Sequence, residues 1–410
     1  MASLPHQSSV IQKLLTPYEV LSNPEEDFTQ ETDVEADQTV TRTKWHHEPT
    51  LSGTTRPCYY MLRGLGIWQP DDCSVFFKVY NCFGYLILIA VLIAIMALSY
   101  VHNRSFECTE LLNNIMTVIT VSCPFIFTKY YFYFGNYEAL VRNITQLPGV
   151  SALARKLSIA YSCFSMVLWC LSVVFFYVHW RPFFNSFFEH ALYGVTAFFA
   201  MGYWTSWLSI YGFVCHLHKA QIVNFKSGMV AEFKKTHSVM AERKSLANLT
   251  NKLNDLLSCL GQTQKDFSQI ISIAVGYHIV DMVIFSIAYW TDSFGKTYPM
   301  WQYAGTLAYD VMSIFIKLYP ASVVCLHLHK TMVAVGAQCR PRFPQADIPK
   351  DRFGFYTYIY LREQDAGFRI LGVKITLRLT VGLFVTMLTV AAAFLKLTLA
   401  LRSGQRPLLP

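Results

Sequence analysis

Charged residues are scarce in this chain of 410 residues: they make up 15% of it, whereas soluble domains carry about 25%. Apolar residues make up 53%. This balance is typical of a polytopic membrane protein. The net charge is +8, but its basic residues gather in the connections between apolar windows. We therefore expect membrane lipid around the chain, and no nucleic-acid partner.

Motifs for catalysis and metal binding are also missing. The sequence has no P-loop, no HExxH, no G-x-S-x-G and no CxxC pair. Its 11 cysteines are an odd number scattered through apolar stretches, where free cysteine packs as a small apolar residue. We therefore expect no enzyme activity, no catalytic residue, no metal site and no cofactor.

Residues 1–57 lack an early apolar run of the signal-peptide kind and are polar and acidic. Such a composition predicts a disordered cytoplasmic tail. Seven apolar windows follow, each near the roughly 20 residues that a spanning helix needs. They cover 82–101, 111–134, 158–179, 188–215, 267–290, 302–328 and 375–400. The chain is thus predicted to be an all-α membrane protein, with seven transmembrane helices in a domain at 58–401 and a short extracellular tail at 402–410.

Lysine and arginine divide unequally between the two alternate sets of connections. The set that includes the N-terminal region holds about 25 of them and the other set about five, and basic residues favour the cytoplasmic side. We therefore expect a cytoplasmic N-terminus and an extracellular C-terminus. This is the reverse of a G-protein-coupled receptor, and the Asp-Arg-Tyr and Asn-Pro-x-x-Tyr motifs of that class are absent.

The tetrapeptide His-Leu-His-Lys occurs twice, each time just after a cysteine, within "VCHLHKAQIV" at 214–223 and "VCLHLHKTMV" at 324–333. Both copies fall where a window ends on the expected cytoplasmic side. Cationic and amphipathic residues are favoured at that position by the interface and by the helix dipole. Chelation of a metal by His216 and His218 is disfavoured, because residues two apart on a helix point to opposite sides.

The long connection at 216–267 contains a leucine seam with steps of three and four residues, which indicates a short heptad pattern. Its members are Leu246, Leu249, Leu253, Leu256 and Leu260. Gly261 follows directly and predicts a helix stop. We expect a helical cytoplasmic anchor formed from 216–267 and 329–374. The seam would lie in a bundle at a subunit contact or, alternatively, on the bilayer surface.

These features resemble the invertebrate gustatory receptor and insect chemoreceptor superfamily. The resemblance is carried by seven helices with an inside N-terminus, long helical inner connections and "MLRGLGIWQPDD" before the first window. The family signature in the last helix is Thr-Tyr, five apolar residues and Gln-Phe. Here "TVAAAFLKL" keeps only Thr389 and has Lys396 at the Gln position. The chain therefore resembles a divergent member, such as those of the nematode branch, some of which look like light or peroxide sensors.

The resemblance implies a ligand-gated cation channel built as a homo- or hetero-tetramer with related subunits, in the plasma membrane of sensory neurons. It also implies that the last helix lines the pore. We therefore take Thr386, Thr389, Ala393 and Lys396 as candidate pore-lining residues. Plain helix packing would also explain the small and hydroxyl residues of this segment. Lys396 departs from the family pattern, because four lysines near a pore mouth would repel cations.

The resemblance places a small-molecule pocket among the second to sixth helices. Trp204, Trp207 and Tyr211 share one helical face, and Asp281 and Asp310 are ionisable residues inside apolar windows. These five are the candidate ligand-binding residues. Core or lipid packing is the alternative for the aromatic face, and a structural polar contact is the alternative for the aspartates. Lys317 lies two turns from Asp310, so we expect any ion pair to cross to another helix.

Asn103 begins an N-x-S sequon on the expected outer side and is a candidate glycosylation site. The leading functional hypothesis is a gustatory-like chemosensory receptor that acts as a ligand-gated cation channel subunit. The alternative is a seven-helix sensor of light or peroxide, using the tryptophan-rich interior, or a seven-helix receptor that does not conduct.

Overall fold

A computed structural model describes most of the chain from Arg56 onward. The described residues are 56–67, 75–102, 108–133, 137, 141, 150–180, 186–235, 239–290, 300–339, 358, 362, 366–370 and 372–402. The predicted disordered tail lies outside this set except for its last two residues, and so does all but the first residue of the tail predicted at 402–410. Asn103 also lies outside it, so its glycosylation stays a prediction.

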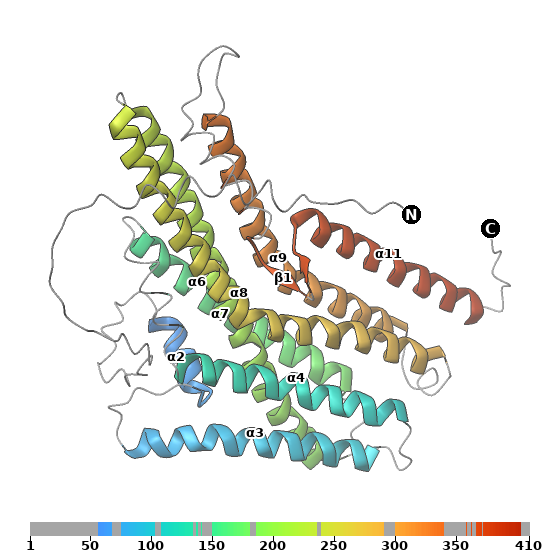
Figure 1. The fold of residues 1–410 in the computed structure, drawn as a ribbon. Helices are drawn as coiled ribbons and strands as arrows, with labels where there is room; N and C mark the ends of the chain where they lie inside the picture. The colour runs from blue at the N-terminus through green and yellow to red at the C-terminus, as the bar shows by residue number, and fades with distance from the viewer. Residues whose placement is uncertain are drawn as a thin grey trace, which may run out of the picture. The chain divides into compact units, whose positions relative to one another are not determined.

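Each of the seven apolar windows lies on one long helix of the described residues (Figure 1). No window extends more than two residues beyond its helix, although several helices are much longer than their windows. The seven long helices are α3 (Val75–His102), α4 (Cys108–Tyr133), α6 (Val150–Trp180), α7 (Phe187–Lys235), α8 (Val239–Trp290), α9 (Met300–Cys339) and α11 (Leu377–Arg402). A short helix, α2 (Arg56–Gly64), precedes them. The windows therefore located the long helices well, because long apolar segments form the strongest pattern in this sequence.

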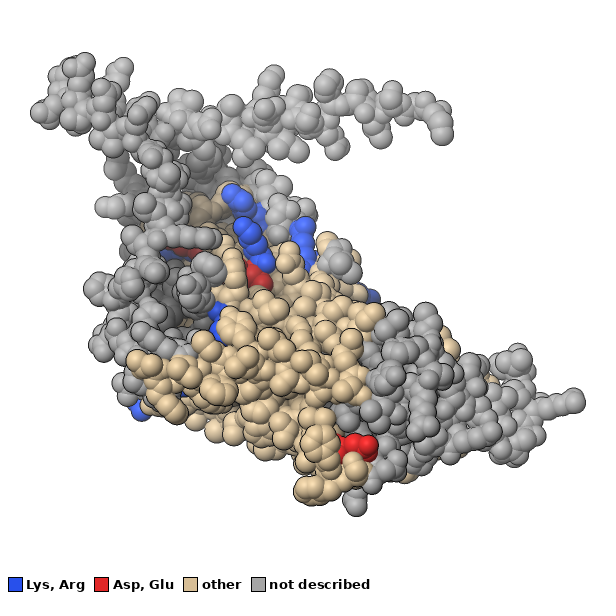
Figure 2. Space-filling model, turned by 90° about the horizontal axis from the view of Figure 1, so that it is seen from below, with Lys and Arg blue, Asp and Glu red and all other residues tan. Residues whose placement is uncertain are grey.

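Among the described residues, segments of four helices are long and apolar enough to cross a membrane: Leu153–Phe175, Ser245–Ile287, Tyr303–Ala337 and Leu377–Ala400. Cys82–Ala97 is a shorter apolar segment of the same kind. Figure 2 shows a face on which nearly all the described residues are uncharged, with a few charged side chains at its margins. The chain is thus a helical multi-pass membrane protein, as predicted. The number of spans and their orientation stay predictions.

Helix α7 occupies the centre of the helix packing, because it contacts α3, α4, α6, α8 and α9. Every residue from Gly202 to Cys215 is buried. A helix stretch that is covered on all sides needs an apolar composition all round rather than one apolar stripe. Helix α11 contacts α9, so α9 connects the central helix with the last one.

Helices α7 and α8 extend side by side beyond α3 and α4 at one end (Figure 1). The five seam leucines of α8 are between 1% and 6% exposed and belong to the chain's own core. The seam is therefore an intramolecular packing face within this chain. Its role in an anchor between subunits stays a prediction.

Gly261 does not end a helix, so that prediction is wrong: α8 runs unbroken from Val239 to Trp290. A glycine inside a helix costs about 1 kcal/mol relative to alanine. The buried face continues on both sides of it, through Leu256 and Leu260 before and Phe267 after. Tertiary packing of that face outweighs the local preference.

A two-stranded sheet stands where a helical anchor was expected. Helix α9 does continue to Cys339, but β1 (Arg369–Ile370) then pairs antiparallel with β2 (Val373–Lys374). Gly367 and Gly372 flank β1 with φ values of 116° and 81°. These values lie in the left-handed region that L side chains disfavour, so a helix cannot pass through this segment.

This hairpin is fixed to the core through Phe368. The Phe368 side chain is 1% exposed, and its N–H donates to Cys325 Sγ of α9 at 3.2 Å. Its ring meets Tyr211 of α7 edge to face, with ring centroids 6.4 Å apart. The entry to α11 is therefore held against both α7 and α9.

Two glycines allow the segment after α2 to lie against α3. A Cβ on Gly84 would overlap the carbonyl oxygen of Gly66, and the Tyr80 hydroxyl donates to Gly64 O nearby at 2.7 Å. Gly84→Ala is expected to lower the free energy of unfolding by about 1–3 kcal/mol, because only backbone stands in the way. Thermal unfolding of the purified protein in detergent measures this.

The matched control is Gly276→Ala in α8, where a Cβ would meet nothing within 4 Å. Alanine is the better helix former there, so this variant should be neutral or slightly more stable. Equal losses in the two variants would contradict the close contact of Gly66 and Gly84.

Candidate functional site

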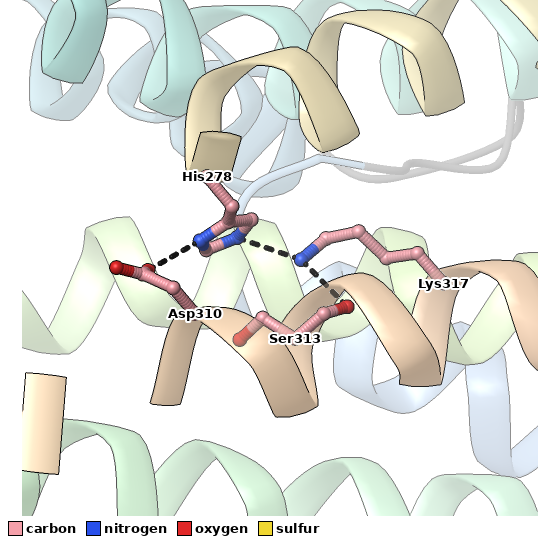
Figure 3. Close-up of polar contacts among 4 residues, drawn as sticks. All are labelled: His278, Asp310, Ser313 and Lys317. Carbon is pink, nitrogen blue, oxygen red and sulfur yellow. Dashed lines mark hydrogen bonds and ion pairs between the residues drawn. The ribbon is translucent and has the colours of Figure 1, made fainter. Parts of the chain in front are cut away.

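A chain of three ionisable side chains lies in the helix core, between α8 and α9 (Figure 3). Lys317 Nζ lies 2.7 Å from His278 Nε2, and His278 Nδ1 lies 2.7 Å from Asp310 Oδ1. Lys317 Nζ also donates to the carbonyl oxygen of Ser313 at 3.1 Å. The three side chains are 1–2% exposed. We call them the Lys–His–Asp chain.

The donors in this chain follow from its chemistry. An ammonium group has only donors, so His278 Nε2 accepts from Lys317. The imidazole proton is then on Nδ1, which donates to the Asp310 carboxylate. The arrangement is a neutral histidine between a cation and an anion. Lys317 Nζ and Asp310 Oδ1 are thereby hydrogen-bonded, whereas Asp310 Oδ2 is buried without a hydrogen-bond partner among the described residues.

Two further groups adjoin the chain from α7 and α8. Lys317 Nζ lies 4.4 Å from the ring centroid of Trp204, a cation–π contact with α7. Asp281 follows His278 by one turn of α8 and lies within electrostatic reach of Asp310. The Lys–His–Asp chain therefore connects three helices through polar contacts in an otherwise apolar interior.

A surface-open cavity of about 510 Å³ lies between α6 and α9, and Leu171, Val174 and Trp301 of its wall are 59–63% exposed. We call it the α6–α9 cavity. Its walls are almost entirely apolar, and Ser172 and Tyr309 supply the hydroxyl groups. It is lined by Leu168, Leu171, Ser172, Val174, Phe175, Val178, Trp301, Gly305 and Tyr309. Its volume and composition suit a small, mostly apolar molecule.

Tyr309 connects this cavity with the Lys–His–Asp chain. On one side its ring stacks on Phe175 of the cavity wall, with centroids 5.2 Å apart and an interplanar angle of 13°. On the other side it lies 6.0 Å from the ring of His278. An occupant that moved Tyr309 would therefore act on the ionic chain directly.

The structure separates the five predicted pocket residues. Trp204 and Asp310 meet at the Lys–His–Asp chain, with Asp281 beside them. Trp207 and Tyr211 continue along α7 as an aromatic column: Trp207 lies 5.4 Å from Trp204 and stacks on Tyr211 at 5.9 Å. None of the five lines the α6–α9 cavity. Their role in ligand binding stays a prediction.

Sequence reasoning missed His278, Tyr309 and the α6 wall of the cavity. The polar contacts of Lys317 and Asp310 do cross to another helix, but they cross to His278 of α8, which the sequence did not reveal. The sequence feature that could have indicated this site is His278 itself, a polar residue one helical turn before Asp281 inside an apolar window. Nothing in the sequence marked Phe175 or Gly305, since both read as ordinary residues of packed helices.

The candidate pore residues share the face of α11 that points away from α9. Thr386, Thr389, Ala393 and Lys396 are all exposed in the single chain. The opposite face packs on the core through Leu383, Met387, Ala391 and Leu395. The predicted stripe is thus available to a neighbouring subunit, to lipid or to a pore, and its pore-lining role stays a prediction.

His218, from the first repeated string, is buried at the contact of α7 and α8. The Thr263 hydroxyl donates to Cys259 O at 3.1 Å, so it accepts from His218 Nε2 at 2.7 Å. Within the described residues no group of histidine, cysteine or acidic side chains is arranged to hold a metal ion. His218 therefore links α7 to α8 through its hydrogen bond with Thr263.

His218 gives the fold a pH dependence whose sign is fixed by burial. Burial lowers the pKa of His218 from 6.5 to about 4, so between these values the unfolded chain binds the extra proton. Stability should fall as the pH drops from about 7 towards 4, by of the order of 2–3 kcal/mol. Thermal unfolding at pH 7.5 and 5 should show a smaller drop for His218→Gln. Equal drops in both proteins would contradict this assignment.

Comparisons with known proteins agree on the fold alone. No protein-family model matches the chain, and no curated protein matches its sequence. The structure is similar to that of the insect olfactory receptor OR5 from Machilis hrabei in complex with eugenol, with a TM-score of 0.52 and 14% identity over 84% of this chain and 97% of that one. A second structure of that receptor gives a TM-score of 0.53 and 13% identity over 85% and 99%. The chain therefore has an insect chemoreceptor-like fold, as the sequence resemblance implied.

Proposed function

We propose that this chain is a subunit of a chemosensory, ligand-gated cation channel in the plasma membrane. The observation that carries the proposal is the link from the α6–α9 cavity, through Tyr309, to the Lys–His–Asp chain between α8 and α9. Helix α11 packs on that same α9. A ligand in the cavity would shift α9 and so change the position of α11, in a fold that resembles that of an olfactory receptor.

The ligand we propose is a small apolar molecule with a hydroxyl or similar polar group. Apolar walls would hold its body, and Ser172 and Tyr309 would fix its polar end. Eugenol, which the similar receptor binds, is a molecule of this class. With the predicted orientation, the cavity lies towards the outer ends of α6 and α9, where a ligand from outside would enter.

The pore we propose lies between four copies of α11, from identical or related subunits. The exposed stripe of Thr386, Thr389, Ala393 and Lys396 would face it. Hydroxyl groups suit a wet pore, and a ring of lysines would reduce the entry of cations. A gustatory rather than olfactory role rests on the sequence resemblance alone.

The function is tested by current recording in cells that express the chain, during application of a panel of small hydroxylated compounds that includes eugenol. An evoked cation current is expected.

Lys396→Gln should raise cation over anion permeability several-fold, because it removes four positive charges from the pore, and Thr389→Val should change conductance. The matched control is Arg378→Gln, an exposed charge at the start of α11. An evoked current with unchanged selectivity in the Lys396 variant would exclude α11 as the pore helix.

The orientation has its own test. An epitope tag after Pro410 should be accessible to antibody on intact cells, and any attached sugar should be on Asn103. Sugar on Asn248, which is exposed on α8, would reverse the orientation.

One observation favours a second candidate function, a sensor of light or peroxide. The aromatic column of Trp204, Trp207 and Tyr211 has ring spacings of 5.4 Å and 5.9 Å and begins at the cation of Lys317. A light-evoked or peroxide-evoked response that persists in the Lys396 variant, but is lost with Trp204→Phe or Trp207→Phe, would support this function over the first.

A further inference from the structure

The α6–α9 cavity opens sideways, onto an exposed face of α6. Leu171, Val174 and Val178 of its wall are exposed, and steps of three and four residues place them on one face of the helix. Val167, one turn before Leu171, continues this face outside the cavity and is exposed as well. The mouth of the cavity is therefore part of a longer apolar stripe.

Most of that stripe belongs to Leu153–Phe175, one of the segments that are long and apolar enough to cross a membrane. Other apolar side chains of the same segment, among them Ile159 and Phe164, are also exposed. In a helical membrane protein, apolar side chains at the surface of a spanning helix meet lipid tails. The mouth thus lies on a surface that suits hydrocarbon.

The length of the cavity is close to the thickness of one leaflet. Along α9 its wall runs from Trp301 to Tyr309, which spans about 12 Å at a rise of about 1.5 Å per residue. The hydrocarbon core of a bilayer is about 30 Å thick, so one leaflet supplies about 15 Å. Trp301 precedes the predicted span at 302–328 by one residue, and tryptophan favours the headgroup level. The cavity therefore extends from that level into the region of the acyl chains.

The side chains of the mouth are also those of a lipid-facing surface. Among the described residues that line the cavity none is charged, and the hydroxyl-bearing residues Ser172 and Tyr309 are less exposed than the mouth. We propose that the ligand enters the α6–α9 cavity sideways, from the hydrocarbon of the outer leaflet and not from the aqueous phase. The cavity as the ligand site and the choice of leaflet rest on the proposed function.

This route selects compounds that dissolve in the bilayer. Each methylene added to a compound concentrates it about fourfold in hydrocarbon relative to water. A compound of the same size with a permanent charge is excluded, because charge is costly inside the bilayer. The concentration that the protein senses is therefore the one in the membrane, and long-chain phenols should be more potent than their water-soluble analogues.

A ligand anchored in the membrane tests the route. The anchored probe is a phospholipid whose acyl chain ends in a photoreactive phenol, and the free probe is para-hexylphenol with the same photoreactive group. The full chain is reconstituted in lipid nanodiscs and illuminated, and mass spectrometry identifies the labelled residues. Both probes should label Ser172, which lines the cavity and is buried. An excess of unmodified para-hexylphenol should prevent both reactions.

Variants locate the entrance. Val174→Trp places a large side chain in the mouth and should abolish labelling of Ser172 by the anchored probe. The matched control is Val167→Trp, on the same face of α6 but outside the cavity, which should be labelled as the unmodified protein is. Gly305→Leu fills the cavity and should lose labelling by both probes, whereas Gly276→Leu on α8 should keep it.

Three results would overturn the proposal. Labelling of Ser172 by the free probe alone would place the entrance on the aqueous side or show that a neighbouring subunit covers the mouth. Equal labelling of the Val174 and Val167 variants by the anchored probe would place the opening elsewhere. Labelling by neither probe would remove the cavity as a ligand site. The readout needs no current, so a labelled chain that conducts nothing would contradict the channel and keep the route.

Discussion

Lys317→Met is expected to destabilise the fold by about 3–5 kcal/mol and to abolish ligand-evoked current. The substitution removes the cation of the Lys–His–Asp chain and leaves the Asp310 carboxylate buried with a neutral histidine. Breaking a buried pair by removing one partner costs more than the pair contributes, because the remaining charge is uncompensated. Thermal unfolding in detergent and surface expression measure the loss.

The double variant with Lys317→Met and Asp310→Asn separates charge from packing. It removes both charges, so it should recover most of the stability that the single variant loses, which gives a large coupling energy in a double-mutant cycle. The control is Lys396→Met on the exposed face of α11, which should leave stability unchanged. Additive losses at Lys317 and Asp310 would show that the two residues do not form one network.

The ionic chain has a physical role that is independent of any ligand. Apolar side chains pack equally well in several registers inside a bilayer, because lipid tails are as apolar as leucine. Hydrogen bonds at 2.7 Å between α8 and α9 allow only one register. The cation–π contact extends this constraint to Trp204 of α7. We therefore expect the chain to set how these three helices move relative to each other.

The long helices could be predicted from the sequence because each rests on a strong local pattern. An apolar window depends on 20 consecutive residues, and its helix persists whatever its neighbours are. The seam leucines from Leu246 to Leu260 are similarly local, and the structure buries all five. Orientation, in contrast, rests on the count of basic residues alone.

The site could not be predicted to the same degree, because it depends on which helices face each other. His278 and Lys317 are 39 residues apart, and only the packing of α8 on α9 brings them to one point. The α6–α9 cavity arises where Phe175, Gly305 and Tyr309 fail to fill the space between two helices. No local pattern records a gap of this kind. The hairpin of β1 and β2 was also not predicted. The sequence analysis expected a helix there, whereas Gly367 and Gly372 adopt positive φ values that a helix does not allow.

Gly305→Leu is expected to remove the response to whichever compound of the panel activates the channel, or to raise its half-maximal concentration by at least about 100-fold. Gly305 lines the α6–α9 cavity, and a Cβ there would meet Phe175 only at 3.8 Å, an ordinary contact. The backbone therefore accepts a side chain, and the other carbons of leucine would occupy the ligand's space. Loss of a well-fitted apolar contact surface of this size corresponds to a few kcal/mol of binding.

Stability distinguishes a filled cavity from a damaged fold. Filling empty apolar space adds packing contacts, so the unfolding temperature of Gly305→Leu should stay the same or rise. The matched control is Gly276→Leu on α8, where a Cβ meets nothing within 4 Å and no cavity wall is touched. It should respond to the compound with an unchanged half-maximal concentration. If Gly305→Leu is stable, reaches the surface and responds as the unmodified protein does, the ligand binds elsewhere, and the aromatic column of α7 becomes the next place to test.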